Sequence, residues 1–209
     1  MSRWLIALVV ATSGVAHAEA PGLGTPADVS TTNTSAPADM SDQAIGAMIG
    51  VAGGGRTTPG GLLVAGHYYY QLNDQDWFDG AATFVFGSGE PDCFRDRADA
   101  MICDHGIADG YGGTLNVTAR RFLPSLASGT FWPFVRAGVG GGIVRFSDDE
   151  VTGITLFLIG GTGLRASVSD TIAVTAGADL ELGVGAFTNS VGFEPQLGVR
   201  ISAGAEFKL

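Results

Sequence analysis

Charged residues are scarce in this chain of 209 residues, and long apolar runs are missing. Asp, Glu, Lys and Arg make up 15% of the sequence, while hydrophobic residues make up 45%. A typical soluble protein has about 25% charged residues. No segment has 18 consecutive apolar residues, so no transmembrane helix is expected. The chain is therefore apolar, but its apolar residues are scattered rather than gathered into membrane-spanning helices.

Side chains that carry chemistry are also few. The only histidines are His17, His67 and His105, and the sequence has no G-x-S-x-G, H-E-x-x-H or P-loop motif. We therefore expect no enzymatic activity, no cofactor and no metal site. Acidic residues outnumber basic residues by 21 to 11, which argues against nucleic acid as a partner.

The first 18 residues have the three parts of a secretory signal peptide. Arg3 gives a positive start, residues 4–10 are apolar, and Ala16-His17-Ala18 is a small-x-small cleavage site. Residues 19–42 are rich in Pro, Thr, Ser, Ala and Asp and have no apolar period, so we expect a disordered periplasmic leader. The folded domain is expected to cover residues 43–209.

From residue 43 onward, apolar and polar positions alternate. In residues 171–187 the even positions from Ile172 to Ala186 are all aliphatic, while the odd positions carry Asp179 and Glu181 among small residues. Successive side chains of a strand point to opposite faces, so the pattern predicts a strand with one apolar face. Similar runs in residues 43–53, 62–71, 78–86, 111–123, 131–146, 154–168 and 196–209 bring the number of predicted strands to eight.

Two architectures fit these strands: a soluble barrel or sandwich, and a membrane barrel. Glycine contributes 33 residues and dominates the polar faces of the predicted strands. Charged residues occur there only about once per strand, which is too few for a surface that faces water. Aromatic residues flank the turns at one end, as an interfacial girdle does; they are Tyr68, Tyr70, Trp77, Phe78, Phe122, Phe131, Trp132, Phe134 and Phe207. The sequence therefore favours an all-β, eight-stranded, antiparallel, up-and-down transmembrane β-barrel with its apolar face toward lipid.

The charged side chains of the polar faces are then predicted to lie in the lumen. An eight-stranded barrel is only wide enough for side chains to fill it, and buried charges must be paired. We therefore expect a salt-bridged interior and no broad pore. The predicted lumen residues are Asp79, Arg120, Arg136, Arg165, Asp179, Glu181, Glu194, Arg200 and Glu206.

Cys93 and Cys103 are the only cysteines, and both lie in the longest predicted loop, residues 87–110. In an exported protein such a pair predicts a disulfide, here across a short hairpin. The surrounding acidic residues have no recognised metal-ligand spacing. If the N-terminus lies in the periplasm, alternation of the turns places this loop outside the cell.

The signal peptide, the alternating strands, the aromatic girdle and the last strand, GVRISAGAEFKL, together resemble the small outer-membrane β-barrel superfamily, the OmpA-like and OmpX-like eight-stranded barrels. The resemblance covers residues 43–209. It implies a location in the bacterial outer membrane, contact with outer-membrane lipid and insertion by the barrel-insertion machinery. The last strand of this superfamily usually ends in an aromatic residue, whereas this chain ends in Leu209, with Phe207 two positions earlier.

The pattern identifies a fold more closely than a function. We expect a structural or surface-interaction role through the external loops, with an unidentified extracellular ligand. A narrow channel or small-ligand-binding barrel that uses the charged lumen is the alternative. A lipid-modifying barrel enzyme is a third possibility.

Overall fold

The computed structural model describes residues 43–87, 92–95, 100–104, 110–146, 150–188 and 191–209. The predicted signal peptide and leader lie outside these residues. The described strands are β1 (Gln43–Gly54), β2 (Gly61–Gln71), β3 (Asp76–Phe86), β4 (Asp92–Arg95), β5 (Met101–Asp104), β6 (Tyr111–Phe122), β7 (Phe131–Phe146), β8 (Val151–Ser167), β9 (Ile172–Phe187) and β10 (Gly192–Lys208). One 3-10 turn, η1 (Pro124–Leu126), precedes β7. In this part of the chain no helix is long and apolar enough to cross a membrane.

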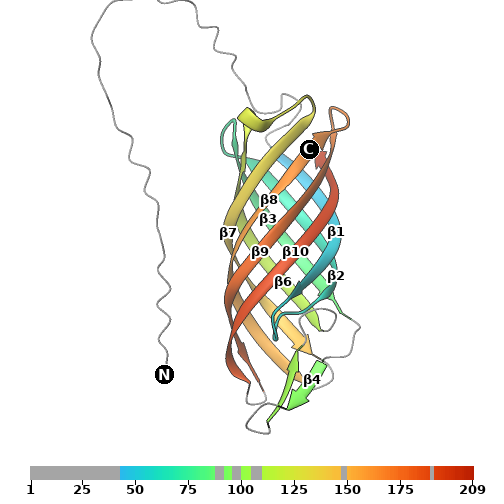
Figure 1. Cartoon of the computed structure of the whole chain (residues 1–209). Helices are drawn as coiled ribbons and strands as arrows, with labels where there is room; N and C mark the ends of the chain where they lie inside the picture. The colour runs from blue at the N-terminus through green and yellow to red at the C-terminus, as the bar shows by residue number, and fades with distance from the viewer. Residues whose placement is uncertain (1–42, 88–91, 96–99, 105–109, 147–149, 189–190) are drawn as a thin grey trace, which may run out of the picture. The chain divides into compact units, whose positions relative to one another are not determined.

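Eight of the strands form a closed antiparallel barrel in the order β1-β10-β9-β8-β7-β6-β3-β2 (Figure 1). The strands β1 and β10 close the barrel. Their pairing runs from Ala44 opposite Lys208 to Gly54 opposite Gly198. The predicted eight-stranded up-and-down barrel is therefore confirmed. The strands β4 and β5 form a separate two-stranded ribbon within the connection from β3 to β6, where the sequence predicted a hairpin.

The two ends of the barrel differ in their connections. At the terminal end, where Gln43 and Lys208 lie, the strands are joined through residues 72–75, 123–130 and 168–171. The first of these is an Asx turn, in which Asn73 Oδ1 accepts hydrogen bonds of 2.9 Å from the backbone N–H groups of Gln75 and Asp76. At the opposite end, here called the loop end, the connections include residues 87–110. This alternation matches the prediction.

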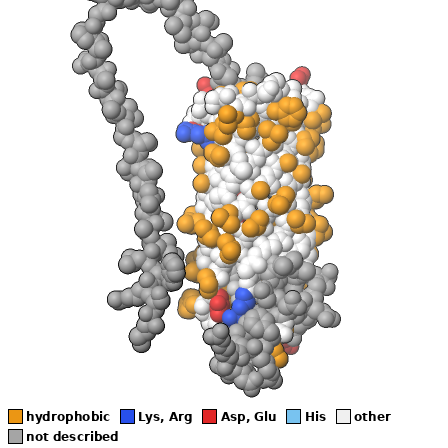
Figure 2. Space-filling model, viewed as in Figure 1, with side chains coloured by type: hydrophobic (Ala, Val, Ile, Leu, Met, Phe, Trp, Pro, Cys, Tyr) orange, Lys and Arg blue, Asp and Glu red, His pale blue; other side chains and the backbone are white. Residues whose placement is uncertain are grey.

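The alternation of side chains also matches the prediction on all eight barrel strands. Aliphatic side chains point away from the barrel and are left uncovered by protein: Leu156, for example, is 66% exposed and Ile154 is 65% exposed. Figure 2 shows these side chains spread over the wall, while the charged side chains in view lie near its two ends. Soluble monomers rarely expose apolar patches larger than a few hundred Å². The wall is therefore built to face lipid.

The strands are long enough for this role. The strands β1, β2, β3 and β6 have 11 or 12 residues, and β7 to β10 have 16 or 17. A tilted strand crosses the hydrocarbon layer with roughly 9–11 residues. The longer strands therefore have residues to spare beyond the hydrocarbon.

Outward aromatic side chains mark both ends of the wall. At the terminal end they include Tyr68, Tyr70, Phe131 and Phe207, which belong to the predicted girdle. At the loop end they include Phe84, Phe86, Tyr111 and Phe193, which the sequence analysis did not single out. Aromatic belts at two levels are typical of outer-membrane barrels.

The girdle prediction was wrong for three of its members. Trp77, Phe122 and Phe134 are each only 1% exposed and point into the barrel, where they form an aromatic cluster with Ala44 and Tyr69. The half-buried Trp132 packs against this cluster. The reason is strand alternation: Trp77 stands two positions before the inward Asp79, so it must share the inward face.

Candidate functional site: the filled lumen

Eight of the nine predicted lumen charges lie buried inside the barrel. They are four arginines, Arg120, Arg136, Arg165 and Arg200, and four carboxylates, Asp79, Asp179, Glu181 and Glu206. Strand alternation places them there, because each occupies an inward position of β3, β6, β7, β8, β9 or β10. The two signs are equal in number, so the charges can neutralise one another.

Glu206 is the centre of the first group of ion pairs, near the terminal end. Its Oε1 accepts hydrogen bonds of 2.7 Å from Arg120 Nη1 and from Thr175 Oγ1, and its Oε2 accepts one of 3.1 Å from Arg165 Nε. Arg165 also donates to Ser167 Oγ. Both oxygens of this carboxylate therefore have donors, which offsets the cost of burying its charge.

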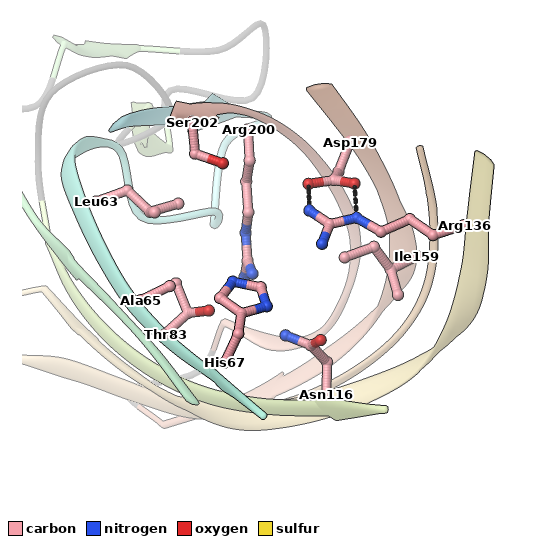
Figure 3. A pocket seen from close by; sticks show the side chains of 10 residues that line it. All are labelled: Leu63, Ala65, His67, Thr83, Asn116, Arg136, Ile159, Asp179, Arg200 and Ser202. Carbon is pink, nitrogen blue, oxygen red and sulfur yellow. Dashed lines mark hydrogen bonds and ion pairs between the residues drawn. The ribbon is translucent and has the colours of Figure 1, made fainter. Parts of the chain in front are cut away.

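Asp79 continues the same group toward the middle of the lumen. Its Oδ1 lies 2.8 Å from His67 Nδ1, and its Oδ2 accepts a 3.0 Å hydrogen bond from Arg136 Nη1. Arg120 Nη2 lies 3.6 Å from the same Oδ2, which links Asp79 to Glu206. The other edge of the Arg136 guanidinium clasps Asp179 through Nε and Nη2 (Figure 3). Such two-pronged pairs fix geometry as well as charge.

Arg200 and Glu181 form a second group, nearer the loop end. Arg200 Nη2 lies 2.7 Å from Glu181 Oε1 and donates a 3.2 Å hydrogen bond to Thr114 Oγ1. Its guanidinium carbon lies 5.6 Å from the centre of the Phe157 ring, within the range of a cation–π interaction. Among the described residues, no hydrogen bond or ion pair joins Arg200 or Glu181 to Arg136 or Asp179.

Glu194 does not belong to either group. It has the inward alternation, but it lies near the loop end of β10, and its side chain is 25% exposed. Its partner is Arg56 of the connection between β1 and β2, at 3.7 Å. The prediction that Glu194 joins the lumen network was therefore wrong, because β10 extends beyond its pairing with β1, which ends at Gly198.

The aromatic cluster closes the terminal end and holds Arg120. The guanidinium carbon of Arg120 lies 4.2 Å from the centre of the Tyr69 ring and 4.4 Å from that of Phe134. Phe122 meets Phe134 edge-on, with ring centres 6.0 Å apart. Cation–π contacts are strongest where water is excluded, so the cluster stabilises the arginine on the faces that Glu206 leaves free.

The connection of residues 55–60 closes the loop end. Gln196 Nε2 donates hydrogen bonds to the backbone O of Thr57 (2.6 Å) and to its Oγ1 (3.2 Å). Thr58 Oγ1 donates to the backbone O of Leu197 at 3.0 Å. On the other side, Pro59 packs so closely on Gly112 that a Cβ there would lie 2.9 Å from Pro59 Cγ. Because β10 and β6 lie on opposite sides of the barrel, this connection, here called the lid, spans the mouth.

The lumen is thus crossed from β10 to β6 at three heights. Arg120 reaches Glu206 near the terminal end, Arg200 reaches Thr114 closer to the loop end, and the lid bridges the two strands at the mouth. Neither the lid nor the place of Tyr69 beside Arg120 was predicted from the sequence. Among the described residues, no group of three or more His, Cys, Asp or Glu side chains is arranged to hold a metal ion.

The ribbon of β4 and β5 places the two cysteines in register. Cys93 and Cys103 are directly opposite each other in the antiparallel pair. This arrangement suits a cross-strand disulfide, and the bond itself stays a prediction.

Comparisons with known proteins identify the fold. No family model matches the chain, and no curated protein matches its sequence. Among solved structures, Neisserial surface protein A matches with a TM-score of 0.59 at 14% identity, over 81% of this chain and 98% of that protein. The N-terminal barrel of Pseudomonas aeruginosa OprF matches with a TM-score of 0.47 at 13% identity, over 78% and 97% of the two chains. Ail of Yersinia pestis matches with a TM-score of 0.41 at 16% identity, over 80% and 100%.

The likeness to Neisserial surface protein A extends over almost the whole of that protein, and it agrees with the closed barrel. The chain has the fold of the small eight-stranded β-barrels of the bacterial outer membrane.

Proposed function

We propose that this protein is a closed, non-conducting barrel of the outer membrane that acts as a structural element and presents its loop-end connections to partners outside the cell. The observation that carries the proposal is the threefold crossing of the lumen by Arg120 with Glu206, by Arg200 with Thr114, and by the lid. A lumen filled in this way leaves the wall and the two ends as the surfaces available for contact.

Of the two ends, the loop end is the better candidate for recognition. The terminal end is joined by short connections, whereas the loop end carries residues 87–110 with the ribbon of β4 and β5. Binding residues are concentrated in loops held by a rigid scaffold. A Cys93–Cys103 disulfide would rigidify the ribbon, since it would tie two directly paired positions.

The same arrangement does not favour the channel alternative. A cavity in the middle of the lumen has a volume of about 20 Å³, and one water molecule needs roughly 10–15 Å³ by this measure. A hydrated ion that moved through the lumen would have to break the buried pairs of Arg120, Arg136 and Arg200.

Biogenesis by the barrel-insertion machinery is part of the proposal. The C-terminal strand β10 presents Phe207 on its outward face, and Leu209 N–H donates a 3.2 Å hydrogen bond to the backbone O of Gln43. We propose that this strand is the segment the machinery reads, with the terminal end left in the periplasm.

Conductance in planar bilayers tests the closed lumen. The purified protein, added at concentrations at which a diffusion porin gives regular current steps, is expected to leave the membrane current at its baseline. Regular steps that scale with salt concentration would refute the non-conducting role and favour the channel.

The orientation is tested in intact cells with a membrane-impermeant maleimide. A Thr188→Cys variant at the loop end should be labelled, whereas an Asp74→Cys variant at the terminal end should be labelled only after the outer membrane is opened. Both positions are exposed and lie between strands, so they form a matched pair. The reverse pattern would place the loop end in the periplasm and remove the basis for a surface role.

A further inference from the structure

A small polar cavity separates the two groups of ion pairs. It has a volume of about 20 Å³, and Arg136 and Asp179 of the first group and Arg200 of the second line it. Figure 3 shows these side chains around a common space together with His67, Asn116 and Ser202. The remaining lining comes from Thr83 and from the apolar Leu63, Ala65 and Ile159.

Four side chains of this lining carry polar atoms without a protein partner. In the described part of the chain, Thr83, Asn116 and Ser202 make no side-chain hydrogen bond, and His67 makes one, through Nδ1 to Asp79. All four residues are more than nine-tenths buried, with exposures of 3% for Thr83, 7% for Ser202 and 8% for Asn116 and His67. Buried polar groups in native proteins are almost always satisfied, by protein or by ordered water.

We infer that this cavity is a specific hydration site that holds one ordered water molecule, hydrogen-bonded to side chains among His67, Thr83, Asn116 and Ser202. The volume is sufficient for one water and too small for a chain of them. A buried water typically makes two to four hydrogen bonds, and the polar atoms of these four side chains that lack a protein partner can supply that number.

The charges around the cavity select a neutral ligand. Arg136 is clasped by Asp179, and Arg200 is paired with Glu181, so each guanidinium beside the cavity is already neutralised. A metal cation would meet two arginines, and an anion would meet the Asp179 carboxylate. Water can donate and accept in turn, as hydroxyl and amide side chains require.

The site gives the water a structural role. It is lined by Arg136 and Asp179 of the first group and by Arg200 of the second, and no hydrogen bond among the described residues joins these two sets directly. A water bound to Asn116 and Ser202, among the lining side chains, would join β6 to β10 in the space between the two groups. This inference does not depend on the role of the loops.

A crystal structure at a resolution that defines ordered water, with a second crystal soaked in bromide, tests the site. We expect a peak in the cavity within hydrogen-bond distance of at least two of the four side chains, and no anomalous signal from bromide there. A bromide peak would overturn the inference in favour of an anion site. A cavity without density would overturn it in favour of a dry void.

Water-oxygen relaxation dispersion in detergent micelles gives an independent measurement. Asn116→Leu removes one partner and fills space, and the dispersion amplitude should fall by the contribution of about one long-lived water. Thr118→Val is the matched control, because Thr118 is the next inward residue of β6 but does not line the cavity. Equal amplitudes in wild type and Asn116→Leu, or an equal fall in the control, would contradict the assignment.

Discussion

Glu206 offers the most informative perturbation of the lumen. Its carboxylate is 2% exposed and accepts hydrogen bonds from Arg120, Arg165 and Thr175. Among the described residues, the Glu206→Ala substitution would leave Arg120 with Asp79, at 3.6 Å, as its remaining ion-pair partner. It would also remove the 3.1 Å hydrogen bond that Arg165 Nε donates to the Glu206 carboxylate. Breaking a buried pair from one side typically costs about 3–5 kcal/mol, because a charge is left uncompensated. We expect a loss of unfolding free energy within that range.

Glu206→Gln separates the charge from the shape. The amide keeps the volume of the side chain, and its oxygen can still accept from Thr175, but the negative charge is lost. We expect a loss smaller than that of Glu206→Ala. In the double variant Glu206→Ala, Arg120→Ala, the cost should be less than the sum of the two single losses, because the uncompensated guanidinium of Arg120 is removed.

Glu194→Ala is the matched control for Glu206→Ala. Both glutamates lie at inward positions of β10, but Glu194 is partly exposed and pairs with Arg56 at 3.7 Å. Surface pairs contribute about 0–1 kcal/mol, so this variant should stay close to wild type. Urea-induced unfolding from lipid vesicles, followed by tryptophan fluorescence and by the gel shift between folded and boiled protein, measures each free energy. Equal losses for the two variants, or a loss below about 1 kcal/mol for Glu206→Ala, would refute the reasoning.

Two further predictions concern the wall and the loop. Leu180→Arg on the outward face of β9 should lower the unfolding free energy by about 2–4 kcal/mol, as a cation near the bilayer midplane does. Glu181→Gln, at the next position, should affect insertion far less. The same unfolding assay compares the two variants, and the reverse order would mean that the strand register is off by one. Peptide mass mapping without reductant should recover Cys93 and Cys103 in one disulfide-linked fragment, and free thiols at both positions would contradict this expectation. A variant with Ser at both positions should keep the gel shift of the folded barrel.

Strand alternation made most of the fold predictable. The apolar faces of residues 171–187 and of the last strand sufficed to assign inside and outside, and with them the buried positions of Asp179, Glu181, Arg200 and Glu206. The alternation has a period of two residues. Once the face of one charged residue is known, the face of every other residue in the strand follows. The register of β9 with β10 then brings Arg200 opposite Asp179 and Gly198 opposite Glu181.

Strand alternation would also have corrected the prediction of which aromatic residues form the girdle. Trp77 shares its face with Asp79, Phe134 with Arg136, and Phe122 with Arg120, so these three rings had to point inward if the charges did. Proximity to a turn gives only the level of a residue along the barrel, not the face of the strand on which it lies. The level of a residue along the barrel and the face of the strand on which it lies are independent. Both are needed to predict whether an aromatic side chain meets lipid.

Other features depend on contacts that a single strand does not encode. Glu194 has the alternation of a lumen residue, but its exposure depends on where β1 stops pairing with β10. The lid depends on Gln196 and Leu197, which meet Thr57 and Thr58 from 139 residues away. Pro59 and Gly112 come together only once the barrel has closed.

The central claim is that the aliphatic faces meet lipid and the charged faces meet one another. Nitroxide spin labels placed singly along β9, from Ile172 to Phe187, test it in lipid vesicles through their accessibility to oxygen and to a water-soluble nickel chelate. We predict a two-residue period, with labels at even positions accessible to oxygen most strongly near Leu180, and labels at odd positions shielded from both reagents. Access of the nickel chelate to the even positions around Leu180 would show that this wall meets water and would contradict the account.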